Sequence, residues 1–265
     1  MKGAKENLFR YRNFLASIPL ANYRDQFQKV KWVEQDLPNE MLPQKSIFNY
    51  YWKTQNFLSF ESWFDSFWEE LHTNPETLKV LKEFKKYHFD KDNDGWFKKG
   101  FEARMNRTWV SVLTQLDFCY MLSYVAQKQN KILTLECNAD LDIKKGIDLK
   151  IGNVGFQVAK ISQRKEARAA AKTKKKGQIE VLTIPYPVYN IEEIKRKTTS
   201  PRVVEENRAA YGRTFHSFYK YCELLNNGFV VFAENYIAPI VKNIADIQKL
   251  KQEVKQISLE LSGEI

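Results

Sequence analysis

The segment over residues 146–162, with the sequence GIDLKIGNVGFQVAKIS, constrains the fold of this chain most strongly. Its pattern predicts a short strand that ends in Asp148, a turn at Gly152-Asn153, and a second strand that carries Lys160. Two strands joined by so short a turn pair as an antiparallel hairpin. The segment therefore places an acidic and a basic residue on neighbouring strands of a sheet.

Helical and strand patterns cover most of the remaining chain. The longest helical pattern spans residues 96–130, where apolar residues recur at intervals of three and four. Further helices are predicted over residues 5–30 (with a break at Pro19), 60–72, 75–88, 201–226 and 243–262, and strands over residues 132–137, 147–151, 155–161, 178–186 and 228–235.

This order of elements predicts an α/β fold, in which a mixed sheet is flanked by helices and follows a mainly helical N-terminal region. We divide the chain into a helical N-terminal region over residues 1–95, a core over residues 96–240, and a C-terminal helix over residues 241–265.

Basic residues outnumber acidic ones. The chain has 42 lysine and arginine residues against 32 aspartate and glutamate residues, which gives a formal net charge of +10. Such an excess favours a polyanionic partner, either nucleic acid or an anionic membrane, through release of counterions on phosphate contact. From the charge we expect nucleic acid as the partner. No apolar run approaches the length of a membrane span.

The cysteines and the N-terminus indicate a reducing compartment. Cys119, Cys137 and Cys222 are odd in number, far apart and without CxxC spacing, which argues against a disulfide framework or a zinc site. The start of the sequence lacks the apolar core of a signal peptide. We therefore expect a soluble protein of the cytoplasm.

Several catalytic classes are excluded by what the sequence lacks. Only His72, His88 and His216 are present, too few for the usual zinc hydrolase or histidine-metal nuclease. The sequence contains no GxSxG elbow of a serine hydrolase, and neither a GxxxxGK nor a GxGxxG phosphate-binding loop.

Asp148 and Lys160 are the residues best suited to catalysis. A carboxylate can hold a hard cation, and a lysine can stabilise the charge that grows on a phosphate or help to deprotonate a water. Adjacent strands lie about 4.8 Å apart, so the two side chains can share one metal ion and one phosphate. The alternative is a surface acid and a surface lysine on an ordinary hairpin.

The strand that carries Lys160 leaves the second acidic ligand open. An acid is expected two residues before the lysine, where Val158 stands, and strict alternation places Gln157 on the other face. Gln157 could approach a metal only if a bulge re-aims it. Otherwise the further ligand is a backbone carbonyl or a carboxylate of another segment, for which the candidates are Asp142, Glu136 and Glu102.

A strongly basic stretch follows this strand and is predicted to contact DNA phosphates or base edges. Its basic residues are Arg164, Lys165, Arg168, Lys172, Lys174, Lys175 and Lys176. A second, weaker candidate surface contains Arg202, Arg208 and Arg213. The alternative for the first stretch is a solvated charged helix.

Five segments in order resemble the TaqI-like type II restriction endonucleases. They are VEQDLP (33–38), NYYWK (49–53), RTWVSVLTQLDFCYMLSYVA (107–126), LDIKKGIDLKI (141–151) and FQVAK (156–160). Together they extend over roughly the first 160 residues and are more specific than the acid–lysine pair alone.

The resemblance implies a restriction-endonuclease-like fold with a PD-(D/E)XK-type catalytic core and DNA-binding elements. It implies Mg²⁺-dependent hydrolysis of both strands of duplex DNA by a homodimer at the palindrome TCGA, cut after the T, with a cognate DNA methyltransferase that protects host DNA. By position, Asp148 matches the catalytic and metal-binding aspartate and Lys160 the catalytic lysine. Asp142 matches a further acid of the site and its metal, and Gln157 belongs to a shared Gln-Val-x-Lys pattern.

Two other functions are compatible with the residues. A repair or junction nuclease with the same core would cleave DNA by structure or damage instead of by sequence. A non-catalytic basic protein would bind nucleic acid through charge alone.

Overall fold

The structure is a computed structural model that describes residues 3–31, 33–89, 94–161 and 174–264, and for residues 174–176 it describes the backbone only. The chain forms two compact units. We call Ser17–Leu116 the helical unit, and Met1–Ala16 together with Asp117–Ile265 the sheet unit. The division into a helical N-terminal region (1–95), a core (96–240) and a C-terminal helix (241–265) stays a prediction.

The helical unit is built around buried aromatic side chains. It contains α2 (Leu20–Phe27), η1 (Asn39–Met41), α3 (Gln44–Phe48), η2 (Asn49–Lys53), α4 (Phe60–Thr73), α5 (Pro75–His88) and the first part of α6 (Asp94–Lys128). Trp109 of α6 is fully buried and contacts the rings of Tyr23, Tyr51 and Phe60. Buried rings of this size contribute strongly to the stability of a core.

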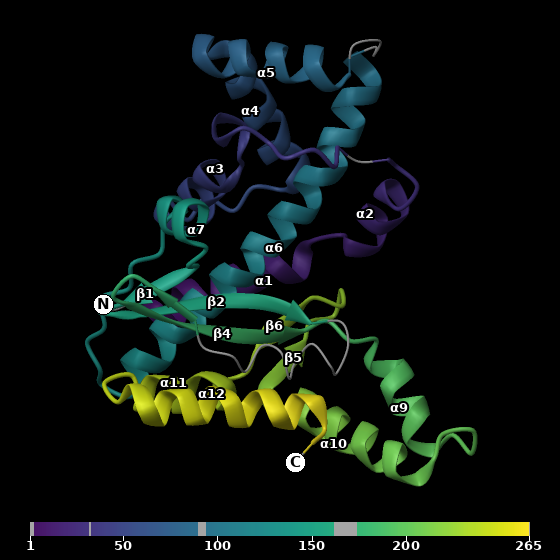
Figure 1. Ribbon diagram of the computed structural model, residues 1–265, viewed down its shortest axis with the longest axis vertical. Helices are drawn as coiled ribbons and strands as arrows, with labels where there is room; N and C mark the ends of the chain where they lie inside the picture. Colours follow the sequence, from purple (N-terminus) through teal and green to yellow (C-terminus); the bar gives the residue numbers. More distant parts are fainter. Residues whose placement is uncertain (1–2, 32, 90–93, 162–173, 265) are drawn as a thin grey trace. The chain divides into compact units, whose positions relative to one another are not determined.

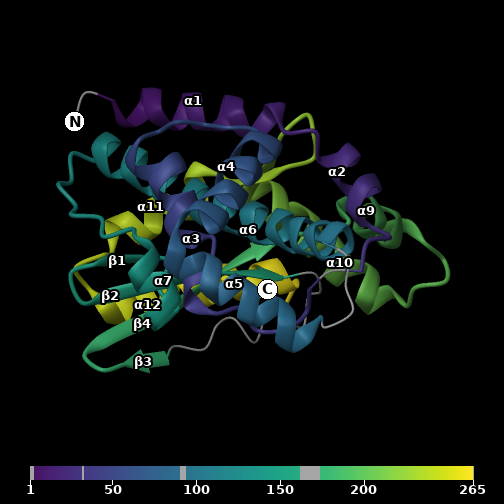
Figure 2. The same cartoon turned by 90° about the horizontal axis from the view of Figure 1, so that it is seen from above.

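The sheet unit contains a mixed four-stranded sheet. Its strands are β1 (Leu149–Ile151), β2 (Val154–Ile161), β3 (Lys174–Lys176) and β4 (Ile179–Pro187), in the spatial order β1-β2-β4-β3 (Figure 2). β2 runs parallel to β4, and β1 and β3 pair antiparallel at the two edges. The mixed sheet flanked by helices confirms the predicted α/β class.

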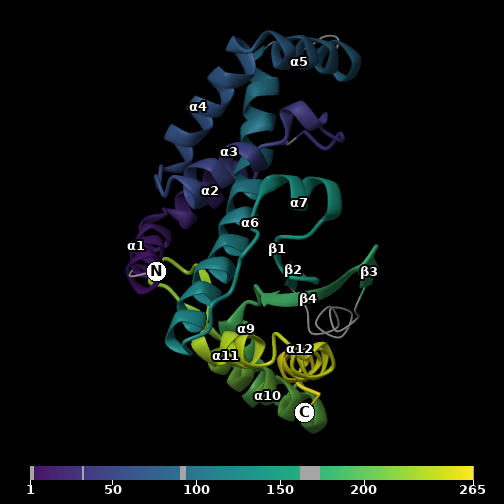
Figure 3. The same ribbon diagram turned by 90° about the vertical axis from the view of Figure 1, so that its left-hand side faces the viewer.

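Helices cover both sides of this sheet. The helices of the sheet unit are α1 (Ala4–Ser17), the end of α6, α7 (Ala139–Lys145), α9 (Ile191–Thr199), α10 (Glu205–Tyr221), α11 (Glu234–Lys242) and α12 (Ile247–Ser262), and the unit also contains a second, two-stranded sheet of β5 (Cys222–Leu224) and β6 (Val230–Phe232). α7 lies on one side of the four-stranded sheet and α12 on the other (Figures 1 and 3). No helix among the described residues is long and apolar enough to cross a membrane.

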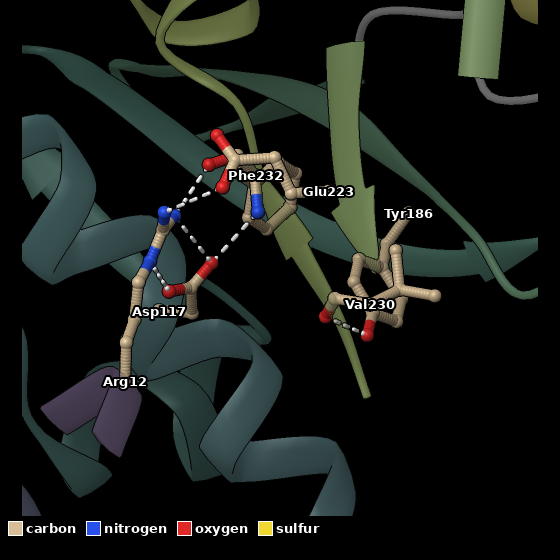
Figure 4. A network of polar contacts seen from close by, with 6 residues as sticks. All are labelled: Arg12, Asp117, Tyr186, Glu223, Val230 and Phe232. Carbon is tan, nitrogen blue, oxygen red and sulfur yellow. Dashed lines mark hydrogen bonds and ion pairs between the residues drawn. The ribbon is translucent and has the colours of Figure 1, made fainter. Parts of the chain in front are cut away.

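A buried ion pair joins the two ends of the sheet unit's sequence (Figure 4). The Arg12 Nε donates to Asp117 Oδ1 at 3.1 Å, and the backbone N–H of Phe232 donates to Asp117 Oδ2 at 2.8 Å. Arg12 also donates to the Phe232 carbonyl and lies 3.5 Å from the Glu223 carboxylate. One fully buried carboxylate thus ties together α1, α6 and β6.

Arg12→Met is expected to destabilise the protein by about 3–5 kcal/mol, because it leaves the Asp117 charge buried without its cation. Burial already raises the pKa of Asp117, and Arg12 is the main opposing influence. Adding Asp117→Asn should restore part of the loss, since asparagine is uncharged and still accepts from the Phe232 N–H. Urea unfolding of both variants measures this; a double variant no more stable than the single one would contradict it.

Several predicted elements are confirmed and others need correction. The helices at residues 60–72, 75–88, 96–130 and 243–262 and the strand at 178–186 appear close to their predicted bounds. The predicted strand at residues 132–137 is wrong: only Glu136 pairs, in an isolated bridge to Lys150. The predicted helix at 201–226 ends at Tyr221, because Cys222–Leu224 pair with β6, and the strand at 228–235 ends at Phe232, before α11.

Candidate active site

Asp148 lies immediately before β1 and is 2% exposed. The predicted strand ending in Asp148 is therefore corrected: the strand begins after it, and the turn at Gly152-Asn153 and the second strand are confirmed. Leu149 pairs with Phe156, yet the Asp148 N–H also donates to the Phe156 carbonyl at 2.9 Å. Two residues of one strand thus oppose one residue of the other, as in a β-bulge, so alternation no longer sets the direction of Asp148.

The Asp148 carboxylate is held by the backbone of β2. The Val158 N–H donates to Asp148 Oδ2 at 2.6 Å, just beyond the end of the β1–β2 pairing. A hydrogen bond from a backbone N–H to a carboxylate is short and strong, and it fixes the carboxylate in orientation. The sheet therefore holds the Asp148 carboxylate in a fixed position.

Asp142 reaches Asp148 from α7. The Asn138 side chain caps this helix by accepting from the Leu141 N–H at 3.1 Å, and Gly146, with φ of +53°, ends it in the left-handed conformation. Burial raises the pKa of Asp142 to about 6, and a smaller contribution from the neighbouring Asp148 side chain opposes this rise. A carboxyl group that keeps its proton up to about pH 6 beside a second acid is a place where a cation can replace the proton.

Lys160 lies on β2 two residues beyond Val158. Residues of a strand advance by about 3.3 Å each, so the Cα atoms of Val158 and Lys160 are about 7 Å apart. One bound phosphate group could therefore lie near both Lys160 and the Asp148 carboxylate that Val158 holds. Lys160 is exposed, whereas burial lowers the pKa of its ammonium to about 8. The lowered pKa indicates that the ammonium is partly enclosed. The side chain nevertheless has exposed surface, so a phosphate can reach it.

Gln157 is half-buried beside Val158. The β2–β4 register runs unbroken from Val154 opposite Glu180 to Ile161 opposite Pro187. The irregularity at the hairpin thus re-aims Asp148 and leaves Gln157 on the face of β2 opposite to Lys160. A catalytic role for Gln157 stays a prediction.

The segment before α7 is anchored next to the two acids. Glu136 exchanges two backbone hydrogen bonds with Lys150, each 2.9 Å long, and the Lys150 ammonium donates to the Glu136 carboxylate at 2.8 Å. The following residue, Cys137, has its Sγ 3.1 Å from that of Cys119. Burial raises the pKa of the Cys137 thiol, with smaller contributions from Cys119 and the charges of Asp148 and Asp142, which keeps this thiol protonated.

The donor set suits a cation that needs few protein ligands. Within the described ranges, no group of three or more His, Cys, Asp and Glu side chains could hold a metal. Mg²⁺ is commonly held by one or two carboxylates, with waters and substrate phosphate completing its shell. Asp142 and Asp148 fit that pattern, whereas Glu136 is paired with Lys150 and Glu102 belongs to the helical unit.

The predicted DNA-binding residues fall into two groups. Arg164, Lys165, Arg168 and Lys172 lie outside the described residues. Arg202 is exposed in the turn before α10, and Arg208 is half-buried in the second turn of that helix. Both arginines are thus available in part to a ligand of the sheet unit.

Two carboxylates on a hairpin and a short helix, with an exposed lysine on the adjoining strand, are the parts of a metal-dependent nuclease site. A family model described as the TaqI restriction endonuclease matches residues 8–244. The type II restriction enzyme TaqI of Thermus aquaticus is 33% identical over 246 residues, which cover 89% of this chain and 88% of that protein. The type II restriction enzyme TthHB8I of Thermus thermophilus is 32% identical over 269 residues, which cover 98% of this chain and 92% of that protein.

These matches show that the chain belongs to the TaqI restriction endonuclease family, and it is thus a type II restriction enzyme. The resemblance predicted from the sequence is confirmed, and the match extends well beyond the first 160 residues. No solved structure matches the chain.

Proposed function

We propose that this enzyme cuts both strands of duplex DNA at the palindrome TCGA or a related short palindrome, with Mg²⁺, as part of a restriction-modification system. The observation that carries the proposal is the pair of neighbouring acids Asp142 and Asp148 immediately before β1, with Asp148 held by the Val158 N–H. The similarity to two type II restriction enzymes and the net charge of +10 support a DNA substrate. The hairpin with its acids and lysine would be the PD-(D/E)XK-type core.

The side chains have distinct proposed roles in hydrolysis. Asp148, fixed by the Val158 N–H, and Asp142, presented by α7, would hold Mg²⁺. When bound, the ion would supply Lewis-acid stabilisation of the charge that develops on the scissile phosphate. Lys160 would place its ammonium against a non-bridging oxygen of that phosphate, while water attacks phosphorus in line with the departing oxygen.

The partners follow from the substrate. A twofold-symmetric homodimer would present one site to each strand and match the symmetry of a palindrome. Arg164, Lys165, Arg168, Lys172, Arg202 and Arg208 are proposed to contact the DNA. A cognate methyltransferase would protect host DNA in the cytoplasm, as a functional and not a physical partner.

Asp142→Asn is expected to raise the melting temperature of the metal-free protein at about pH 7.5 by roughly 2–5 °C. Burial raises the pKa of Asp142 from 3.8 to about 6, so the folded state holds its proton more tightly than the unfolded chain. Stability therefore falls as the pH rises from about 4 through about 6, and asparagine removes this cost.

Mg²⁺ should stabilise the wild-type protein more at about pH 7.5 than at about pH 5, because the cation must displace the proton. Asp142→Asn should lose most of this stabilisation, and thermal unfolding with increasing Mg²⁺ measures it. Asp140→Asn, an exposed acid on the same helix, is the matched control. Equal Mg²⁺ effects in both variants would exclude Asp142 as a ligand.

Incubation of the protein with unmethylated phage DNA, in Mg²⁺ and in EDTA, tests the function directly when the fragment ends are sequenced. Mg²⁺-dependent fragments with common ends at TCGA are expected. Common ends at another motif would overturn the proposed site alone, and cuts set by junctions or lesions would favour a repair or junction nuclease. Membership of a restriction enzyme family argues against a non-catalytic binding protein.

A further inference from the structure

A hollow of about 750 Å³ opens between the end of α7 and the turn that joins β3 to β4. It is lined by Lys144, Lys145, Gly146, Gly177, Gln178 and Ile179. We call it the α7 hollow. None of these residues has a part in the proposed cleavage chemistry.

The lining of the α7 hollow suits an anion. Lys144 and Lys145 are both exposed, and the only ion pair described for Lys144 is a solvent-exposed contact at 3.4 Å to Asp140. Such exposed pairs are weak and exchange readily for another anion. On the opposite wall, Gly177 is exposed with φ of +64°, and no atom lies within 4 Å of where its Cβ would be. The space beside this turn is therefore open to a ligand.

The sequence next to the hollow is basic. Three consecutive lysines, Lys174–Lys176, form β3, which leads directly into the turn at Gly177. A basic sequence beside a hollow is typical of a surface that follows the phosphate backbone of a nucleic acid.

The α7 hollow lies one helical turn from the metal-binding carboxylates. Asp142 and Lys145 are three residues apart on α7, which places their Cα atoms about 5 Å apart. Successive phosphates of one DNA strand advance by about 3.4 Å along the helix axis. A phosphate in the hollow would therefore be within one or two nucleotides of a phosphate held at Asp142 and Asp148.

We propose that the α7 hollow binds a backbone phosphate of duplex DNA next to the scissile phosphate, through Lys144 and Lys145. The proposal rests on the proposed function and deepens it, since it assigns a contact that positions the cleaved strand. Because α7 is a rigid link between the hollow and Asp142, a phosphate anchored there sets the register of the strand at the metal site. This contact carries no sequence information.

The test is the salt dependence of DNA binding by Lys144→Ala/Lys145→Ala, measured with a short TCGA duplex and with a scrambled duplex in the absence of Mg²⁺. A plot of log affinity against log salt has a negative slope, and its magnitude should decrease by about 1 to 2 in this variant. Each lost phosphate contact lowers that magnitude by about 0.9. Affinity should fall by the same factor for both duplexes. Lys144→Arg/Lys145→Arg should keep the wild-type slope.

Lys255→Ala is the matched control, since Lys255 is an exposed lysine of α12 and is expected to leave the slope unchanged. An unchanged slope in the double alanine variant overturns the proposal. Lysines also stabilise the end of a helix, so reduced thermal stability with an unchanged slope would show a purely structural role and would overturn it too. Absence of Mg²⁺-dependent cleavage by the wild-type protein would instead overturn the proposed function.

Discussion

Asp148→Asn is expected to lower the rate of DNA cleavage by at least about a thousandfold, a loss of about 4 kcal/mol in transition-state stabilisation. The substitution keeps the size of the side chain and an oxygen that can accept a hydrogen bond from the Val158 N–H, so the position of the side chain is preserved. What it removes is the negative charge that would hold Mg²⁺. Single-turnover cleavage of a TCGA duplex measures the effect.

The expected loss belongs to chemistry and not to folding or binding. Asp148→Asn should bind the same duplex at least as tightly as the wild-type protein in the absence of metal, because a buried negative charge near the phosphates is gone. Asp140→Asn, which changes an exposed acid of the neighbouring helix, should cleave at the wild-type rate. If the Asp148 variant retains full Mg²⁺-dependent cleavage, the metal site lies elsewhere in the protein.

The parts of this fold that the sequence predicts well are those with a strong repeating pattern. α6 carries its apolar residues at helical spacing over 35 residues, and the hairpin at Gly152-Asn153 has both strand patterns and a turn. The apolar run over residues 132–137 has strand character as well, but only Glu136 finds a partner strand there. A strand needs a neighbour, and a local pattern does not specify one.

The candidate site was predictable in its chemistry and less so in its geometry. Asp148 and Lys160 follow from residue type and hairpin spacing alone. The approach of Asp142 depends on α7, which is seven residues long and too short to show periodicity. Its ends nevertheless carry readable signals, an Asn138 cap and a left-handed Gly146, which together mark a short helix. The bulge at Asp148 arises from strand pairing and has no local signal.

Lys160→Ala is expected to lower cleavage by about a hundred- to ten-thousandfold, because it removes the charge placed against the scissile phosphate. Burial lowers the pKa of the Lys160 ammonium to about 8, so this charge is lost as the pH rises through about 8. Arginine stays protonated over this range. The ratio of kcat/KM for Lys160→Arg to that of the wild-type protein should therefore rise above about pH 8, by up to about tenfold for each further pH unit.

The ratio isolates Lys160 from other titrating groups. A group that titrates in both proteins, including water activated in the site, changes kcat/KM of both by the same factor. Its effect therefore cancels in the ratio. kcat/KM reports the free enzyme, in which no bound phosphate raises the pKa of the lysine. If Lys160 instead deprotonates the attacking water, its neutral form is the active one, so wild-type activity would increase through about pH 8 while the arginine variant stayed inactive. The two roles thus predict opposite slopes of one measured ratio, and only a rising ratio is compatible with a lysine that acts by its charge.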